Sequence, residues 1–520
     1  MSDDANFDVI VIGSGIGGLT TAGILARVAR LRVLVLESHF KLGGFTHSFR
    51  RKNYEWDAGV HYVGEMYDGA MARRVMDFIT NHGVKWHRMG KTVERIMFPE
   101  GTFEYPDNFN DLQESLIRRF PHEESGIRKY FKDVKRAKGW LDRWYTSKAL
   151  PWPFSWLLTL GSKSLAHRTT GDYLNQCISD PLLKAVLTAQ WPDYGAAPGQ
   201  SAFGIHATVT ADFFNGGYFP IGGSQNISTQ AAAVIEKHGG RCLVNHPVTE
   251  IICEGNRAVG VKVEHKGKTL VFRARNIISN AGATTTFDRL VPRDHCASER
   301  EKVRRLKRGV SATFLFLGLK DDPRKHGFDD ANYWINNTMN ADAPVVKRRG
   351  KRCDFAGVFL SFGSLRNPGQ KHHTAQIITF SEITDWSDHD GTEWNRRGAE
   401  YEREKEIVAD DLINFVEQRT PGLRDLIEFR EVGTPLTVKS FTGHPGGMIY
   451  GQLCDPARLS TDQWPIRTSL KNLFLTGSDI GTPGVNGAMM AGVMTAARIL
   501  GPLGLPRIFG RVFSKANAPA

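Results

Sequence analysis

The 520-residue chain is long enough for two or three domains, and with 41% hydrophobic and 23% charged residues it has the composition of a globular protein. The longest apolar stretch, 149–160, contains two prolines and is shorter than the ~20 residues that a membrane-spanning helix needs. The net charge of +12 is compatible with nucleic acid, an anionic membrane or acidic substrates. Zinc-finger spacing, basic-zipper heptads and RNP aromatics are all missing, so we expect no nucleic-acid partner.

Positive charge is concentrated in residues 300–308 and 347–352, which we interpret either as a solvated face or as a contact with anionic lipid. The six cysteines form no CxxC pair and show no metal-ligand spacing, so we expect free thiols and no metal site. The first residues lack the pattern of a secretory signal, and together these features favour the cytoplasm.

Residues 7–18, FDVIVIGSGIGG, combine a short buried strand with a glycine motif that precedes a helical pattern. Gly13 permits a tight turn, Gly15 lets the backbone approach a pyrophosphate, and Gly18 lets the helix pack closely on the strand. The next predicted strand, 31–37, ends at Glu37, whose carboxylate can accept both ribose hydroxyls of an adenosine. The combination predicts a dinucleotide-binding fold.

The following stretch contains the pair Gly43-Gly44 and then YEWDAGVHYVG, residues 54–64. It resembles the flavin-binding N-terminus of the phytoene desaturase, carotenoid isomerase and retinol saturase family, and more distantly that of amine oxidases. YEWDAGVHYVG is most similar to the retinol saturase version. The resemblance implies FAD as cofactor, with the two glycines and Gly17 and Gly18 among the residues that bind it.

The C-terminal region contains a second part of this pattern. A strand over 473–476 precedes Asp479, and a carboxylate at the end of a strand can bind a ribityl hydroxyl. The amide end of the helix that opens near Gly487 can face the pyrimidine carbonyl of a flavin. In the resembled family, Asp479 and the turn Asn486-Gly487-Ala488 hold these positions.

A third block follows residue 215, with a helix over 224–237 and then alternating strands that return at IISNAG, 277–282. The resemblance puts the backbone of Val248 against the adenine. We therefore expect an α/β fold with a discontinuous Rossmann-like FAD domain and an inserted α+β substrate domain. The FAD domain would comprise 1–75, 215–300 and 430–505, the substrate domain 76–214 and 301–429, and a basic C-terminal tail 506–520.

Strand-like runs at 311–319 and 374–382, and a helical stretch at 400–418, favour a mixed sheet with helices in the substrate domain. The sequence has no second dinucleotide motif, so we expect a separate electron donor or acceptor, which could be a quinone, oxygen, a nicotinamide or a redox protein. A flavin alone can transfer a hydride at carbon.

Five residues are candidates for handling a proton or orienting the substrate, namely His61, Tyr62, Tyr194, His206 and Tyr450. Each of them can also be explained as a structural residue near the cofactor.

The stretch SKALPWPFSWLLTLGSKS, 147–164, is unusually apolar and is flanked by lysines. Such a segment suits a membrane interface, where aromatic rings settle and positive charges meet phosphates. We expect peripheral membrane contact near the mouth of a substrate tunnel, through Trp152, Phe154, Trp156, Leu157 and Leu158. The alternative is that the segment packs into the core of the substrate domain.

These features together predict an FAD-dependent oxidoreductase that desaturates, saturates or isomerises a carbon–carbon bond of a carotenoid, retinoid or fatty acyl chain. One alternative is a flavin amine oxidase, which would need an aromatic cage beside the flavin. The other is a non-enzymatic lipid carrier on the same fold. Known carriers of this kind have lost the cofactor loop, whereas here the motif glycines are intact.

Overall fold

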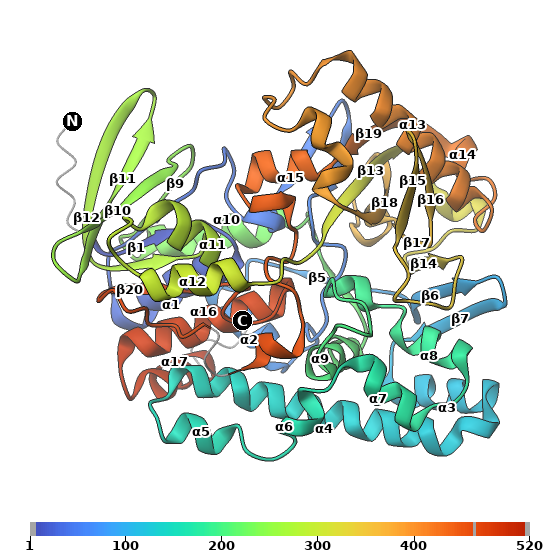
Figure 1. The fold of residues 1–520 in the computed structure, drawn as a ribbon, viewed down its shortest axis with the longest axis horizontal. Coiled ribbons are helices and arrows are strands. Elements are labelled where there is room, and N and C mark those ends of the chain that lie inside the picture. The colour runs from blue at the N-terminus through green and yellow to red at the C-terminus, as the bar shows by residue number, and fades with distance from the viewer. Residues whose placement is uncertain (1–6, 461–463, 515–520) are drawn as a thin grey trace.

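The computed structural model describes residues 7–460 and 464–514. Within these residues the chain forms two seven-stranded sheets, each with its own layer of helices (Figure 1). The first sheet contains both the first and the last strand of the chain, and the second is built from internal segments. The expected fold class, a discontinuous Rossmann-like unit with an inserted α+β unit, is confirmed.

The first sheet has the order β10-β11-β12-β1-β2-β9, with β20 beside β12. Its central strands are parallel and buried on both faces, which is why they are continuous apolar runs such as VIVI and VLVL. The strands of this sheet are β1 (Phe7–Ile12), β2 (Val33–Leu36), β9 (Arg241–Leu243), β10 (Val248–Cys253), β11 (Ala258–His265), β12 (Lys268–Ser279) and β20 (Leu473–Leu475).

The long strand β12 links two parts of this sheet. Its first half pairs antiparallel with β11, and its second half runs parallel to β1 and β20. The strand ends beside the glycine motif, where the Asn280 backbone N–H donates to the Ile12 carbonyl over 2.8 Å. The middle of the chain is thereby brought to the edge where β1, β2 and β20 also end.

Helices α1 and α16, which cover this sheet, approach their neighbours closely at glycine residues. A Cβ on Gly17 of α1 would lie 2.6 Å from the Cα of Gly477, and one on Gly492 of α16 would lie 2.6 Å from the Gly17 carbonyl. Side chains at these positions would force the two ends of the chain apart. The main helices of this unit are α1 (Ile16–Ala29), α2 (Met71–Thr80), α10 (Gln225–Lys237), α11 (Ala283–Thr285), α12 (Ala297–Arg305), α16 (Gly484–Leu500) and α17 (Gly504–Val512).

The second sheet has the order β19-β13-β18-β17-β14-β6-β7 and is antiparallel except for the pair β14–β6. On β13, Phe314 and Phe316 point to one face, while Leu315 and Leu317 pack with helix α13 on the other. The strands of this sheet are β6 (Thr92–Phe98), β7 (Gly101–Pro106), β13 (Ser311–Leu319), β14 (Asn332–Asn336), β17 (Gly357–Ser361), β18 (His373–Ser381) and β19 (Ile427–Gly433).

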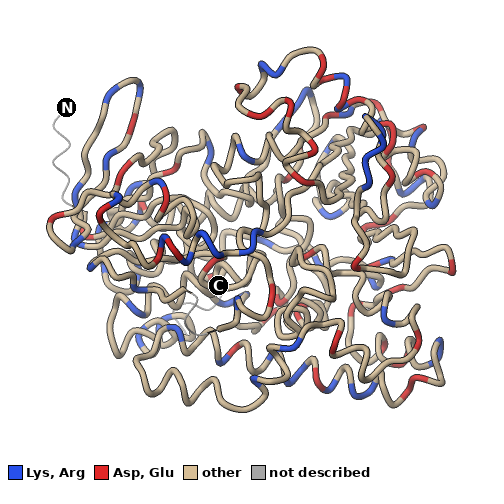
Figure 2. Tube along the Cα trace, in the orientation of Figure 1, with Lys and Arg blue, Asp and Glu red and all other residues tan. Residues whose placement is uncertain are grey.

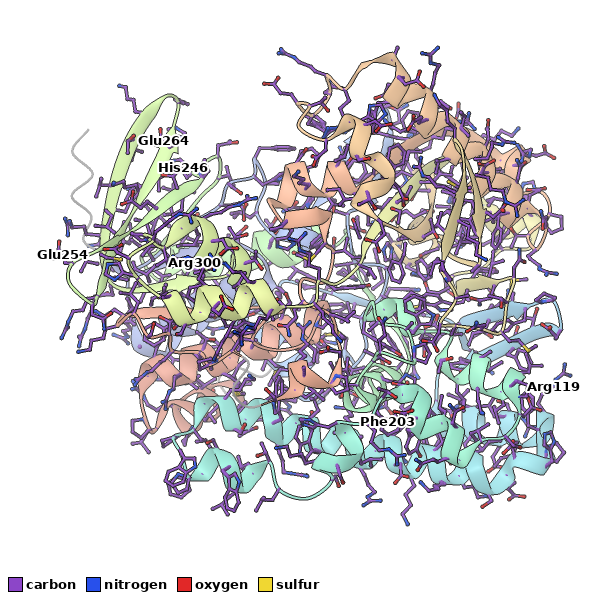
Figure 3. All side chains as sticks on the ribbon, viewed as in Figure 1. Arg119, Phe203, His246, Glu254, Glu264 and Arg300 are labelled. Atoms are coloured by element: carbon purple, nitrogen blue, oxygen red, sulfur yellow. The ribbon has the colours of Figure 1, made fainter. Side chains whose placement is uncertain are left out.

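Three two-stranded sheets and a helical layer complete the described structure. The small sheets pair β3 (Ser48–Arg51) with β4 (Tyr54–Asp57), β5 (Trp86–Arg88) with β8 (Tyr218–Pro220), and β15 (Val346–Arg349) with β16 (Arg352–Phe355). The remaining helices are α3 (Phe109–Arg119), α4 (Glu124–Ala149), α5 (Phe154–Leu158), α6 (Lys163–Ala166), α7 (Thr170–Cys177), α8 (Pro181–Thr188), α9 (Phe203–Asp212), α13 (Gly398–Glu417), α14 (Leu423–Leu426) and α15 (Pro435–Thr442). In α9, Phe203 (labelled in Figure 3) stacks on Tyr173 with ring centroids 3.9 Å apart.

Two boundaries expected from the sequence differ in the structure. Strand β19 crosses residue 430, so that boundary cuts through a strand of the second sheet. Helix α17 occupies 504–512, where a tail was expected, and its Ile508 and Val512 join the core of the first unit. Residues 515–520 lie outside the described part of the chain.

The segment 152–160 is not part of the core. Trp152 is 80% exposed, and Phe154, Trp156, Leu157 and Leu160 are exposed as well. Core packing of this segment, one of the two interpretations from the sequence, is therefore wrong. Among the described residues, none of the helices combines the length and the apolar character needed to cross a membrane.

Figure 2 marks the cations of the two basic clusters, 300–308 and 347–352, along the trace. Most of them are exposed, but some also hold the fold together. Arg300, labelled in Figure 3, is buried and donates hydrogen bonds to the carbonyls of five residues between 287 and 295. In the second cluster, Arg352 pairs with Asp411 of α13 at 3.0 Å. Part of the positive charge therefore serves the fold itself.

Replacing Leu317 by alanine tests the packing of β13 on α13. Leu317 is fully buried, so we expect Leu317→Ala to lower the free energy of unfolding by about 2–5 kcal/mol, measured by urea denaturation. The matched control is Val271→Ala on β12, where the side chain is exposed and the change should stay within about 0.5 kcal/mol. Equal effects at both positions would contradict this packing.

Candidate active site

A cavity of about 1190 Å³ lies between the two sheets. One wall is formed by the carboxyl ends of β1 and β2, the loop after β12 and the start of α16. The opposite wall is formed by β13, β14, β17, β18 and β19 of the second sheet. Pockets at the carboxyl edge of a parallel sheet are the usual ligand sites of α/β folds.

The glycine motif lies at the floor of the cavity. Gly13, Gly15 and Gly17 line it, and Gly13 has φ +91°, a conformation that favours glycine. A Cβ on Gly15 would lie 2.8 Å from the Asn280 side-chain nitrogen. Gly18 does not line the cavity, because it packs under the Gly13 carbonyl, whose oxygen would lie only 2.3 Å from a Cβ on Gly18. Its role is close packing of helix on strand.

Glu37 lines the cavity at the end of β2. One carboxylate oxygen accepts hydrogen bonds from the backbone N–H and the hydroxyl of Ser14, at 2.8 and 2.6 Å. The other accepts from the His39 N–H and the Ser38 hydroxyl, at 2.9 and 3.2 Å. Since a carboxylate offers about four acceptor directions, a ribose hydroxyl would replace one of the serine hydroxyls.

Three further predicted residues line the same part of the cavity, namely Gly43, Gly44 and Val248. The Gly43 N–H donates to the Ser14 hydroxyl over 2.9 Å, so this loop is tied to the glycine motif. A Cβ on Gly44 would lie 3.2 Å from the Cα of Gly15. The two glycine loops therefore meet with almost no side chain between them.

At the C-terminal side, Asp479 and Ala488 line the cavity, whereas Asn486 and Gly487 do not. The Asn486 side chain donates to the Gly64 carbonyl and to Asp212, at 3.0 and 3.2 Å. One oxygen of Asp479 accepts from the Ala283 N–H at 2.8 Å. The other is buried and has no hydrogen-bond partner among the described residues.

These features fit a bound flavin dinucleotide. A buried carboxylate oxygen without a donor is costly, and a ribityl hydroxyl of the flavin would satisfy it. The bare glycine surface provides room for a pyrophosphate beside the amide end of α1. When bound, FAD would supply hydride transfer.

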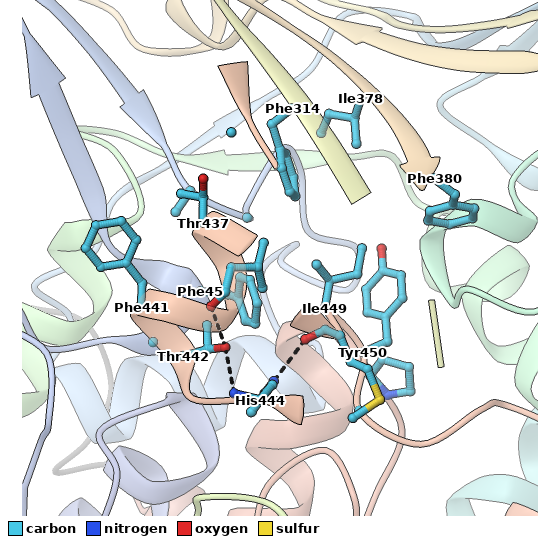
Figure 4. A pocket seen from close by; sticks show the side chains of 18 of the residues that line it. Phe45, Phe314, Ile378, Phe380, Thr437, Phe441, Thr442, His444, Ile449 and Tyr450 are labelled. Atoms are coloured by element: carbon cyan, nitrogen blue, oxygen red, sulfur yellow. Dashed lines mark hydrogen bonds between the residues drawn. The ribbon is translucent and has the colours of Figure 1, made fainter. Parts of the chain in front are cut away.

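The other end of the cavity is apolar (Figure 4). Phe314 of β13, Ile378 and Phe380 of β18, and Ile449 line it with few polar atoms. His444 at its edge is held in place, with its N–H donating to the Thr442 hydroxyl and its ring nitrogen 2.9 Å from the Met448 carbonyl. Such walls can hold a long hydrocarbon.

Of the five predicted candidates for proton handling, His61 and Tyr450 line the cavity. Burial and the charge of Arg366 lower the pKa of His61 to about 3, so its ring is neutral at pH 7. Burial raises the pKa of Tyr450, which therefore stays protonated. Neither residue is an acid strong enough to donate a proton readily at neutral pH.

The other three candidates do not line the cavity. His206 is buried between the hydroxyls of Tyr130 and Tyr194, at 2.8 and 3.0 Å from its two ring nitrogens. Tyr194 and His206 thus belong to a buried hydrogen-bond chain away from the cavity. Tyr62 donates to a carboxylate oxygen of Asp193, 2.6 Å from its hydroxyl.

Sequence reasoning missed two acids, Asp193 and Glu94. Asp193 lines the cavity at the end of a 3-10 turn, Trp191–Asp193. Glu94 lies behind it, 1% exposed, and accepts from Trp334 and Gln190 at 2.7 and 3.1 Å. Burial raises the pKa of Asp193 to about 7 and that of Glu94 to about 8. For Glu94 the sequence did contain a signal. Residues 94, 96 and 98 of β6 alternate toward the interior, and Glu94 is the charged residue among them.

The exposed segment 152–160 does not contribute to the cavity. Helix α5 lies at the lower left of Figure 1, whereas α15, whose Phe441 lines the cavity, lies in the upper half. The expectation that a tunnel mouth opens beside this segment is therefore wrong. Exposed aromatic residues at the cavity are instead Phe40 and Trp394, which both contact Phe441.

We expect Asp479→Ala to lower the affinity for FAD by about 10- to 100-fold. The change removes an acceptor whose hydrogen bond contributes about 1.5–3 kcal/mol. Flavin absorbance after dialysis, at matched protein concentration, measures the loss. Asp294→Ala, at an acid that is 77% exposed, is the control, and equal flavin retention by the two variants would exclude a contact of Asp479 with the cofactor.

Comparison with solved structures shows the same fold at low sequence identity. Wild-type putrescine oxidase bound to putrescine matches with a TM-score of 0.62 and 16% identity, covering 95% of this chain and 99% of the other. Cyclohexylamine oxidase from Brevibacterium oxydans matches with a TM-score of 0.61 and 15% identity, covering 97% and 99%.

Sequence relatives are more similar. All-trans-retinol 13,14-reductase of Homo sapiens is 30% identical over 531 residues, covering 95% of this chain and 85% of the relative. The chloroplastic prolycopene isomerase of Daucus carota is 28% identical over 526 residues, covering 96% and 81%. The family model described as flavin containing amine oxidoreductase matches residues 16–339. The chain thus belongs to the flavin-containing amine oxidoreductases, as an FAD-dependent oxidoreductase of the branch that contains retinol reductases and carotenoid isomerases.

Proposed function

We propose that the protein saturates a carbon–carbon double bond of a long polyene lipid, of the retinoid or carotenoid class. The observation that carries the proposal is a single cavity that joins a flavin-binding floor to an aromatic and aliphatic wall. A substrate held on that wall would lie in the same compartment as the flavin, without an intervening side-chain layer.

The size of the cavity supports a second ligand beside the cofactor. Its volume of about 1190 Å³ exceeds the ~300–1,000 Å³ of typical single-ligand pockets. The aromatic residues that line the apolar end, among them Phe314, Phe380 and Trp334, offer flat faces to a conjugated chain. The names of the relatives, a retinol reductase and a prolycopene isomerase, also concern polyenes.

The ionisation of Asp193 and His61 disfavours an amine substrate beside these two residues. An ammonium group would be attracted by a carboxylate, but burial raises the pKa of Asp193, and His61 is neutral. Tyr450, the residue considered as half of an aromatic cage, lines the cavity beside aliphatic Ile449 (Figure 4). The amine oxidase alternative therefore rests on the shared fold.

A lipid carrier without chemistry is the other alternative. The unpaired buried oxygen of Asp479 and the bare glycine floor both favour retention of a cofactor. The sequence contains one dinucleotide motif, so the electrons would come from a separate donor, a reduced nicotinamide, quinol or redox protein.

An anaerobic experiment separates these functions. Chemically reduced protein mixed with all-trans-retinol or a carotenoid in vesicles is expected to show flavin reoxidation, because the lipid accepts hydride. Bleaching of oxidised flavin by the lipid would instead indicate a desaturase. Bleaching of oxidised flavin by amines but not by lipids would indicate an amine oxidase. If neither lipids nor amines change the flavin absorbance, the remaining function is that of a lipid carrier.

We propose further that the protein docks on membranes through the exposed segment 152–160. Trp152 and Phe154 are apolar side chains that extend into solvent, and Arg143 and Lys163 nearby are exposed and positive. Aromatic rings at the interface and cations at lipid phosphates are the combination that binds peripheral proteins. The proposal commits to an anionic bilayer as the partner.

Sedimentation with vesicles of anionic phospholipid tests the docking segment. We expect Trp152→Ser/Trp156→Ser to lower the bound fraction at least tenfold, since two exposed aromatic side chains are lost. The matched control is Phe40→Ser/Trp394→Ser, which changes exposed aromatic residues at the cavity. If only the control variant Phe40→Ser/Trp394→Ser lost binding to vesicles, the docking surface would lie at the cavity mouth, and the proposal would be contradicted.

A further inference from the structure

We propose that Asp193 is the proton donor of the reaction and that Tyr62 and Glu94 form the relay that returns a proton to it. The inference rests on the proposed saturation, and it assigns the proton that accompanies the hydride. It stands on the hydrogen bond from Tyr62 to Asp193, an acid that lines the cavity, and on the enclosed acid Glu94, which also acts on the Tyr62 hydroxyl.

The path begins at Asp193, the carboxyl that lines the cavity. Its turn, Trp191–Asp193, lies beside the apolar wall, where the Trp191 ring is 5.1 Å from that of Phe380. A lipid on this wall therefore lies next to the carboxyl. The side chain of Asp193 is held by the Tyr62 hydroxyl, which donates to it over 2.6 Å.

Tyr62 connects the two acids. Its ring stacks on Phe213 with centroids 4.2 Å apart, which fixes the direction of the hydroxyl. The hydroxyl also interacts with the carboxyl of Glu94, and both acids contribute to raising the pKa of Tyr62. A hydroxyl between two carboxyls can give a proton to one while it accepts a proton from the other.

Glu94 closes the path on the side away from the cavity. Its carboxyl oxygens accept from Trp334 and Gln190, and the residue is 1% exposed. Buried Arg366 is the nearby cation, and it donates instead to the carbonyls of His61 and Asp330 and to Asn332. The acid pair therefore has no direct ion-pair partner among the described residues.

The protonation state of the pair follows from its surroundings. Burial is the largest cause that raises the pKa of both acids, and the charge of Asp193 adds to the effect on Glu94. The titratable groups that Asp193 influences are Tyr62, Tyr194 and Tyr450, which stay protonated, and Glu94. His61, which is neutral, lines the same cavity. A proton is therefore stored on the pair near neutral pH.

The double bond gains a hydride from reduced flavin at one carbon and a proton from Asp193 at the other, so its π bond breaks and two C–H bonds form. The lipid is reduced by two electrons, the flavin is left oxidised, and Asp193 is left as a carboxylate. Tyr62 then passes its proton to Asp193 and takes the proton stored on Glu94, which is left as a carboxylate.

The first test needs no substrate. Infrared titration of the oxidised flavoprotein is expected to show a carboxylic acid band that disappears as the pH rises through about 7. The amplitude of this band should fall in Asp193→Asn by the share that Asp193 contributes, and in Glu65→Gln by a separate share that Glu65 contributes. Glu65 is a matched control because burial raises its pKa to about 7 as well, while it does not line the cavity. A wild-type protein without this band, or an Asp193→Asn band of undiminished amplitude, overturns the assignment.

The second test measures reoxidation of reduced flavin by all-trans-retinol in a single anaerobic turnover. The wild-type rate should fall above pH about 7, because Asp193 loses the proton that it donates. Asp193→Asn should be slower by about 100- to 10,000-fold and should lose this pH dependence. Asp193→Glu should restore part of both, and Tyr62→Phe should slow repeated turnovers more than the first.

Retained flavin absorbance, thermal stability and retinol binding would show that each variant is folded and loaded. If the wild-type protein turns over and Asp193→Asn keeps its rate and pH dependence, the inference fails while the proposed function stands. If no polyene reoxidises the wild-type flavin, the proposed function fails, and the infrared titration still decides whether Asp193 carries the proton.

Discussion

The close approach of Gly17 and Gly477 is the contact on which the site depends. A Cβ on Gly17 would lie 2.6 Å from the Cα of Gly477, and the neighbouring Thr21 and Thr476 hydroxyls are 3.1 Å apart. Because no side chain separates the two segments, β20 can lie beside β12 and bring Asp479 to the cavity. The glycine floor of the cavity is thus assembled from segments far apart in the sequence, and a larger residue at either glycine would separate its halves.

The wall opposite the floor depends on a different constraint, the alternation of side chains along β13. Phe314 faces the cavity while Leu315 and Leu317 hold the strand against α13, so the apolar wall is backed by a core. Arg366 ties this sheet to the first unit by donating to the His61 carbonyl over 2.6 Å. The two walls of the cavity are therefore joined by the buried cation of Arg366. The apolar wall borders polar groups in two places, at the glycine floor and at Asp193.

Local patterns predicted most of the fold and part of the lining of the cavity. The strand 7–12, the glycine turn, Glu37 and the strand 311–319 follow from apolar periodicity and turn chemistry, which act over a few residues. Asn486 and Gly487 were assigned to the cofactor by resemblance, yet their neighbours are Gly64 and Thr482, because the direction of the helix start depends on tertiary packing. Asp193 and Glu94 lie 99 residues apart and meet through Tyr62, a pairing that no local pattern contains. The exposure of Trp152 likewise depends on what the rest of the chain leaves uncovered.

The contact between the segments around Thr21 and Thr476 has a consequence for biosynthesis. Thr21 and Thr476 are separated by 455 residues, and at about 5–20 residues per second a ribosome needs about 20–90 s to make that stretch. During this time β1 and α1 exist without α16, with the apolar surface of α1 uncovered. Contacts of such high sequence separation form slowly, so the first unit can close only after β20 and α16 have been made.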